Sequence, residues 1–218
     1  NGAVIGGNTN TTVAGTLNVD KGGSIGGGVS AINKDGSAGP DTTVESGGNL
    51  NVSGSIEGNA NTTIQSGGTV NVNGGTIDTA GKTDIQDGAN LNINDGGNVT
   101  LHEGDSWEGT ITNNNSTLTL DNITHTADNS NGNYIQTEGT LNLNNGSNLT
   151  IGEGSSISNG NINIDNSQLN VDNKGQVSGG NINVDNNSQF NVNDGGIVSD
   201  GTINIGNGSS FNIAEGGQ

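Results

Sequence analysis

Apolar residues that return every 20 or 21 positions are the feature that most limits how this chain can fold. In the C-terminal half they form three sets: Ile162–Ile164, Ile182–Val184 and Ile203–Ile205; Leu169–Val171, Phe190–Val192 and Phe211–Ile213; and Ile157, Val177 and Ile197. A fixed period of this length is typical of a solenoid, in which every repeat forms one coil.

Each apolar triplet alternates with Asn or Thr, which indicates a strand with one buried and one exposed face. Such a strand is too short to be stable alone, so its backbone groups must pair with the equivalent strand of the next coil. Three apolar sites per repeat predict three sides, joined by corners of Gly, Asn, Asp and Ser. We therefore predict an all-β, three-sided parallel β-helix, and a right-handed one because right-handed crossovers dominate in parallel sheets.

The same pattern runs through most of the N-terminal half. Its three sides are marked by Val44, Ile64 and Ile85; by Leu50–Val52, Val70–Val72 and Leu91–Ile93; and by Ile56, Ile77 and Val99. We expect about nine coils in one rod over residues 1–218, without an internal domain boundary. The pattern lapses near 30–41, which contains the single Pro, and near 124–134, so both segments are predicted to be inserted loops.

Composition narrows the functional classes. Hydrophobic residues make up only 26% of the chain, but the thin core of a solenoid needs few of them. The net charge of −18, with four lysines and no arginine, argues against nucleic acid and against an anionic membrane surface as partners. No apolar run is long enough to span a membrane, and the absence of Cys excludes disulfides and thiolate chemistry.

The N-terminal half carries a more specific pattern. It reads N-T-N-T-T-V-A-G-T at 8–16, D-T-T-V-E-S-G-G at 41–48 and N-T-T-I-Q-S-G-G-T-V-N-V-N-G-G at 61–75. Over about residues 8–93 this resembles the repeats of AIDA-type self-associating autotransporter adhesins of Gram-negative bacteria, whereas the C-terminal half is closer to filamentous haemagglutinin-like rods. The resemblance implies a right-handed β-helix displayed on the outer membrane, which acts in cell aggregation, attachment and biofilm formation through polar side chains on one face.

The candidate binding residues lie between inward apolar neighbours and should therefore point outward. They are predicted to form two polar ladders along the rod, Asn142, Asn163, Asn183 and Asn204, and beside them Thr150, Asn170, Asn191 and Asn212. A side-chain amide carries both a donor and an acceptor, so it can bond to a sugar hydroxyl or to another ladder. The alternative is that these residues simply form a solvated strand face.

Catalysis is not expected. β-Helical enzymes that act on acidic polysaccharides need carboxylates beside Arg or Lys, and here the four lysines are scattered. The best local set of carboxylates is Glu103, Asp105 and Glu108, near His102 and Trp107. The simpler interpretation of this segment is an irregular acidic turn around a half-buried Trp.

No cofactor is predicted, and calcium is the one ion that we consider. The G-G-x-G-x-D nonapeptide of calcium-binding β-rolls is absent. Asp165 and Asp185, 20 residues apart, should stack on successive coils, where a divalent cation could bridge them; the alternative is two solvated carboxylates. Ice binding would need regular Thr ladders, whereas the outward positions here are mainly Asn.

We hypothesise that the chain is a secreted or cell-surface adhesin segment, displayed on the outer membrane if its source is Gram-negative. It would act through many weak polar contacts in register, with itself or with surface glycans and matrix polysaccharide as partners, and without inserting into the membrane. The alternative is a structural subunit of an extracellular fibre, since the repeat pattern is open at both ends and open coils can stack head to tail.

Overall fold

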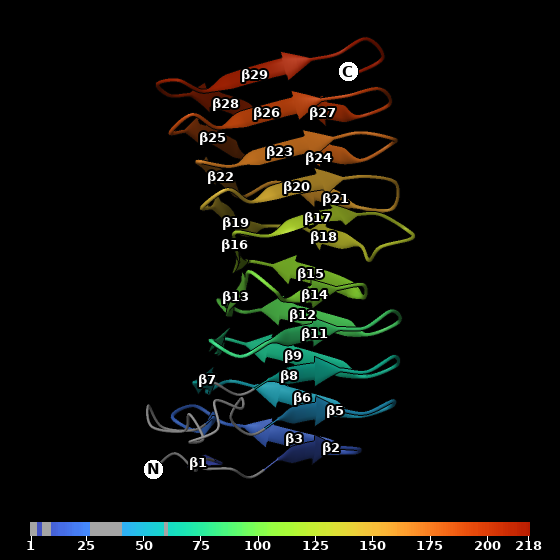
Figure 1. The fold of residues 1–218 in the computed structure, drawn as a ribbon, viewed down its shortest axis with the longest axis vertical. Coiled ribbons are helices and arrows are strands. Elements are labelled where there is room, and N and C mark those ends of the chain that lie inside the picture. Colours follow the sequence, from blue (N-terminus) through green and yellow to red (C-terminus); the bar gives the residue numbers. More distant parts are fainter. Residues whose placement is uncertain (1–3, 6–9, 27–40, 59–60) are drawn as a thin grey trace.

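The chain forms a parallel β-solenoid, seen in a computed structural model that describes residues 4–5, 10–26, 41–58 and 61–218 (Figure 1). Its strands, β1 to β29, are arranged in four parallel sheets. The first and last described strands, β1 and β29, lie at opposite ends of the stack. The described residues contain no helix with the length and hydrophobicity needed to cross a bilayer.

Two sheets run along nearly the whole rod. Sheet A contains β1 (Val4–Ile5), β4 (Ser24–Ile25), β7 (Ser55–Gly58), β10 (Thr76–Thr79), β13 (Asn98–His102), β16 (Ser116–Asp121), β19 (Gly139–Asn144), β22 (Asn161–Asp165), β25 (Asn181–Asp185) and β28 (Thr202–Ile205). Sheet C contains β3 (Thr16–Val19), β6 (Asn49–Val52), β9 (Thr69–Asn73), β12 (Asn90–Asn94), β15 (Thr110–Asn114), β18 (Tyr134–Gln136), β21 (Ser156–Ser158), β24 (Gln176–Ser178) and β27 (Ile197–Ser199).

The third side is divided between two shorter sheets. Sheet B, in the N-terminal half, contains β2 (Thr11–Val13), β5 (Thr42–Val44), β8 (Thr62–Ile64), β11 (Thr83–Ile85) and β14 (Ser106–Trp107). Sheet D, in the C-terminal half, contains β17 (Thr124–Ala127), β20 (Asn148–Ile151), β23 (Gln168–Val171), β26 (Gln189–Val192) and β29 (Ser210–Ile213). Each coil thus contributes one strand to each of three sides.

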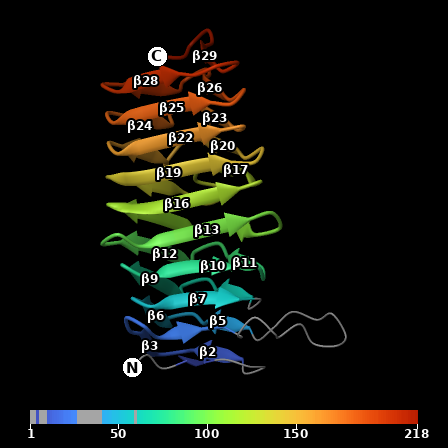
Figure 2. The ribbon, with the colours of Figure 1, turned by 90° about the vertical axis from the view of Figure 1, so that its left-hand side faces the viewer.

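The winding follows from the strand order. In Figure 2 the strands of sheet A face the viewer and run from left to right while the chain climbs from its N-terminus to its C-terminus, which is a right-handed coil. Strands pair with their equivalents one coil away, as Leu50 does with Val70 and Val70 does with Leu91. The prediction of an all-β parallel β-helix with three sides per coil is confirmed.

The core is a set of apolar columns parallel to the rod axis. Strands show the alternating burial that the sequence predicts, for example in β9, where Val70 and Val72 are buried and the residues around them are partly exposed. Corners in the C-terminal half place Asn at positive φ, as at Asn145 (54°) and Asn166 (47°). Asn tolerates this conformation better than most residues, because its short polar side chain bonds locally.

The step from sheet B to sheet D is made by an unusual stretch of core. Trp107 is buried, with 5% of its surface exposed, and its ring contacts His125 in a stack and Tyr134 edge-on, with centroid distances of 4.1 and 5.9 Å. Beside them, the buried amides of Asn113 and Gln136 bond to the Tyr134 hydroxyl, at 3.2 and 2.7 Å. Aromatic and amide groups here fill positions that aliphatic side chains occupy in neighbouring coils.

Two local expectations need correction. Trp107 pairs with Ile85 inside the rod, so it is a core residue rather than a half-buried side chain at an irregular turn. In the last coil Val177 pairs with Val198 instead of Ile197, which is 37% exposed. The reason is that the corner between the inward residues Val192 and Val198 has the same length as that between Val171 and Val177, so Ile197 falls on an outward position.

The two predicted insertions have different outcomes. The segment near 30–41 lies outside the described residues, except for Asp41. The segment near 124–134 belongs mostly to the coil, because its first four residues form β17, which pairs with β20, and Tyr134 begins β18. Between them is a short turn in which the Asp128 carboxylate accepts bonds from the backbone N–H groups of Ser130 and Asn131, at 2.8 and 2.9 Å.

Candidate functional site

The first predicted ladder lies on the outer face of sheet A. Asn142, Asn163, Asn183 and Asn204 are paired through successive strands. Each Nδ2 donates to the Oδ1 one coil earlier, at 2.8 Å from Asn163 and 2.9 Å from both Asn183 and Asn204. An amide has two donor hydrogens and two acceptor lone pairs, so Asn163 and Asn183 each keep one of each available to the outside.

The second predicted ladder lies on sheet D and is used differently. Asn170 is only 8% exposed, although it points outward. Its Nδ2 donates to Asn148 (2.9 Å) and Thr150 (3.3 Å), and its Oδ1 accepts from Gln168 (2.6 Å) and Asn191 (2.9 Å). All four of its hydrogen-bonding positions are therefore occupied within the face. Asn170 organises its neighbours, whereas Asn191 and the exposed Asn212, which bonds to it at 2.9 Å, remain open to solvent.

A third ladder lies on sheet C of the N-terminal half and was not among the predicted site residues. Asn18, Asn51, Asn71 and Asn92 are linked by amide bonds of 2.8, 2.9 and 2.8 Å. The signal that identifies it is the same apolar–Asn–apolar triplet that identifies the other two. It ends where Thr112 follows Asn92 in the column and the outward Ile135 follows Thr112.

The predicted acidic pair lies on neighbouring coils of sheet A. Asp165 and Asp185 are paired on β22 and β25, and both are exposed. The side chain of Asn186 donates to Asp165 at 2.6 Å, and both carboxylates line a groove of about 330 Å³. Within the part of the chain that the structure describes, no three His, Cys, Asp or Glu side chains are grouped closely enough to hold a metal ion. Calcium binding at this pair stays a prediction.

The acidic turn in 102–108 has a structural use for its central carboxylate. Asp105 accepts bonds from the backbone N–H groups of Thr83 and His102, at 2.6 and 2.8 Å. Burial raises the pKa of Asp105, while these two bonds oppose the rise. Glu103 and Glu108 are exposed. The Asp105 carboxylate therefore links one coil to the next, and it is not free to pair with a second acid.

His102 and His125 lie in opposite environments. The His102 Nε2 is 2.8 Å from Asp78, and this hydrogen bond raises the pKa of His102. His125 is stacked on Trp107, and its Nε2 has no hydrogen-bond partner among the described residues. Burial lowers the pKa of His125 to about 4, against the opposing effect of a bond to the Gly132 backbone. His125 is therefore uncharged at neutral pH.

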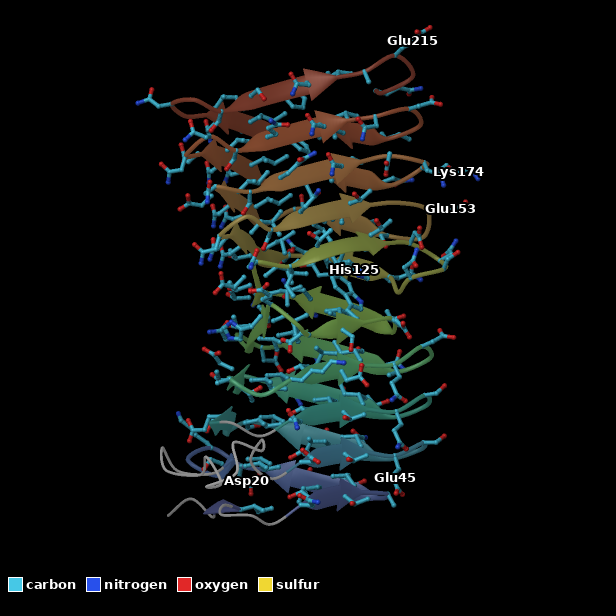
Figure 3. All side chains as sticks on the ribbon, in the orientation of Figure 1. Asp20, Glu45, His125, Glu153, Lys174 and Glu215 are labelled. Atoms are coloured by element: carbon cyan, nitrogen blue, oxygen red, sulfur yellow. The ribbon has the colours of Figure 1, made fainter. Side chains whose placement is uncertain are left out.

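Charge is concentrated at the corners of the rod. Figure 3 shows Glu45, Glu153, Lys174 and Glu215 at turns along one edge, and His125 within the stack. Lys174 bonds to Glu153 at 2.9 Å, across one coil. The strand faces between the corners carry mostly amides and hydroxyls, so the rod presents polar faces bounded by charged edges.

Comparison with known proteins adds little to this geometry. No family model matches the chain, and no curated protein matches it either. Among solved structures it is similar to one described as the crystal structure of the TibC-catalyzed hyper-glycosylated TibA55-350 fragment, with 17% identity, a TM-score of 0.25, and coverage of 99% of this chain and 93% of that chain. Because this TM-score is low, the fold assignment rests on the strand pairing alone.

Proposed function

We propose that this rod is an adhesin-like segment, secreted or displayed on a cell surface, that associates laterally with copies of itself through the Asn ladder of sheet A. The observation that supports this most directly is the in-register column of Asn142, Asn163, Asn183 and Asn204. Because its amides are held by their axial bonds, their free donors and acceptors are already oriented, and little side-chain entropy is lost when a partner binds.

The ladder also explains how weak contacts would become useful. One amide-to-amide contact is worth about 1 kcal/mol. Ladders on two rods share the same axial spacing, since both are built on paired strands, and all rungs can therefore meet at once. Linked contacts on a rigid support give an avidity far above that of a single contact. A binding role of this kind needs no catalytic group.

The test is to replace the two central rungs by lysine, Asn163→Lys with Asn183→Lys. We expect self-association, measured by sedimentation velocity, to weaken by at least about tenfold, because two amide contacts of about 1 kcal/mol each are replaced by paired cations. The substitution also makes the net charge less negative, which by itself would favour association of these acidic rods.

The matched control is Ser158→Lys with Ser178→Lys. These serines pair with each other on the outer face of sheet C and lie in the same part of the rod. The control adds the same charge without changing the ladder, so the association should be unchanged or slightly stronger. Equal weakening in both variants, or no weakening in the Asn variant while its circular dichroism is intact, would show that the sheet A ladder is not the contact surface.

A further inference from the structure

The outer face of sheet D carries no charged side chain, in a chain whose net charge is −18. Pairing places two outward columns on it: Thr124, Asn148, Gln168, Gln189 and Ser210, and Thr126, Thr150, Asn170, Asn191 and Asn212. The inward positions between them include Leu149, Leu169 and Phe190, which are fully buried. A face built only of amides and hydroxyls offers hydrogen bonds without attracting or repelling ions.

A groove runs beside the first of these columns, at the corner between sheets A and D. It has a volume of about 320 Å³ and is lined only by uncharged residues: Thr124, Gly146, Ser147, Asn148, Asn166, Ser167, Gln168, Asn187 and Gln189. Two other grooves of similar size are lined in part by carboxylates, one by Asp41 and Asp84 and the other by Asp165 and Asp185. The groove beside sheet D, which we call the corner groove, therefore differs from them in chemistry.

The polar groups at the floor of the corner groove are already hydrogen-bonded, whereas several side-chain amides on its walls are not. The backbone N–H of Ser147 donates to the Ser167 hydroxyl, and that of Ser167 donates to Ser188, both at 3.1 Å, so the floor groups are already bonded. By contrast, within the described part of the chain no hydrogen bond involves the side-chain amides of Asn166, Asn187 or Gln189. The groove therefore offers a ligand side-chain amides that are free to form hydrogen bonds, above backbone groups that are already paired.

We propose that the corner groove binds a neutral, β-linked hexose polymer that lies along the rod axis. A side-chain amide can donate to one sugar hydroxyl and accept from the next, which suits the neighbouring hydroxyls of a hexose. Consecutive coils lie about 4.8 Å apart, which is close to the length that one sugar adds to an extended β-1,4-linked chain. Each sugar would thus lie beside one coil and meet the side-chain amide of Asn148, Gln168 or Gln189.

Charge favours a neutral polysaccharide in the corner groove over an acidic polysaccharide or a second copy of this chain. An acidic polysaccharide would be repelled by a rod with 22 Asp and Glu residues against four lysines. A second copy of this chain carries the same net charge, and the groove, unlike the sheet A ladder, shows no column of amides bonded in register that would offset this repulsion. A neutral polymer meets neither obstacle. This site is separate from the sheet A ladder and does not depend on self-association.

The experiment is a titration of the full chain with cellohexaose and with chitohexaose, followed by NMR of the side-chain amides and by calorimetry. We expect at least one of the two neutral hexamers to bind and to shift the Asn187 and Gln189 amides, with an affinity that is the same at low and high salt. A galacturonic acid hexamer should not bind. Absence of binding by both neutral hexamers, or binding of the acidic one, overturns the proposal.

The variant that tests the location is Asn187→Gly with Gln189→Thr. Asn187 has a φ of 63°, which Gly adopts freely, and Thr suits an exposed strand position, so the fold should be kept. We expect binding to weaken about tenfold, as for the loss of two hydrogen bonds. The matched control is Asn173→Gly with Gln176→Thr, at an exposed corner and strand outside the groove, where Asn173 has a φ of 44°.

Two further outcomes have fixed meanings. Equal binding by the groove variant and its control would overturn the location, and a change in oligomeric state in the groove variant alone would identify a second copy as the occupant. The Asn163→Lys, Asn183→Lys protein should still bind the neutral hexamer. If it does so, the two proposals are independent. A failure of the self-association proposal would then leave the proposal for the corner groove standing, and a failure to bind sugar would leave the self-association proposal standing.

Discussion

A single histidine inside the rod couples the stability of the central coils to pH. His125 lies on β17 and stacks on Trp107, with 15° between the ring planes. Its pKa is lowered to about 4 by burial, whereas an exposed histidine titrates near 6.5. Between these two values the unfolded chain binds a proton that the folded chain rejects, so this contribution to stability falls as the pH falls from about 6.5 to about 4.

We predict that replacing this histidine by Phe removes the pH dependence that it causes. In His125→Phe the stack on Trp107 is kept, while the titrating group is lost. The wild type should lose about 3 kcal/mol more than the variant between neutral pH and about pH 4. Urea unfolding of both proteins across this range measures the difference. Other groups with shifted pKa values, such as His102, Asp105 and Asp172, whose pKa is raised by burial, are present in both proteins and cancel in the comparison. Parallel pH profiles would contradict the assignment.

At the scale of one element, the sheet D ladder holds its strands together from the outside. Asn170 joins Asn148, Thr150, Gln168 and Asn191 across β20, β23 and β26. Because it is buried by these neighbours, its bonds are shielded from water and contribute more than those of an exposed amide. The amide bonds in the middle of this ladder should therefore contribute more to stability than those at its exposed end.

This ladder predicts unequal costs for the same substitution at two rungs. Asn170→Ala should lower the free energy of unfolding by about 1–3 kcal/mol, because it leaves several amides without their partner. Asn212→Ala, at an exposed rung, should cost about 0.5 kcal/mol or less. Urea unfolding followed by circular dichroism compares the two. Similar costs at both positions would mean that the axial amide bonds add little stability.

The elements also show how far sequence reasoning reaches. Columns such as Leu50, Val70 and Leu91 are predictable, because alternation and a fixed period together set both face and register. The inward Asn113 and Gln136 are not predictable, because their polarity favours an outward position. Their burial depends on bonds to each other, to the Tyr134 hydroxyl and to two backbone carbonyl groups.

The candidate site was likewise only partly predictable from the sequence. The ladder positions follow from the triplets, but the saturation of Asn170 depends on how Gln168 and Asn191 orient their amides. The corner groove depends on residues at the turns, such as Asn187, which carry no period-two signal. Ile197 and Val198 are adjacent and both apolar, so only the length of the preceding corner decides which one faces inward.

At the scale of the whole molecule, net charge controls how closely rods approach. Two copies with 22 acidic and four basic side chains repel each other, and salt shortens the range of that repulsion to about 8 Å at physiological ionic strength. Lateral association through uncharged amides is not itself weakened by salt. The balance between rods in solution and rods in bundles should therefore respond to ionic strength.

We predict that self-association strengthens as sodium chloride is raised from low to physiological concentration. Sedimentation velocity at fixed protein concentration would show a rising fraction of larger species, and the Ser158→Lys, Ser178→Lys control should respond in the same direction. Dissociation on adding salt would mean that ion pairs hold the copies together instead of amide contacts.

The exchange of sheet B for sheet D leaves a seam across the rod. Sheets A and C cross it without a break, through the pairing of β13 with β16 and of β15 with β18. On the third side, sheet B ends at β14 and sheet D begins at β17. When the rod is pulled lengthwise, two hydrogen-bond ladders and the aromatic packing of Trp107 must carry a load that three ladders share elsewhere. The two halves are thus the natural mechanical units of the molecule, and the seam is where tension would first separate them.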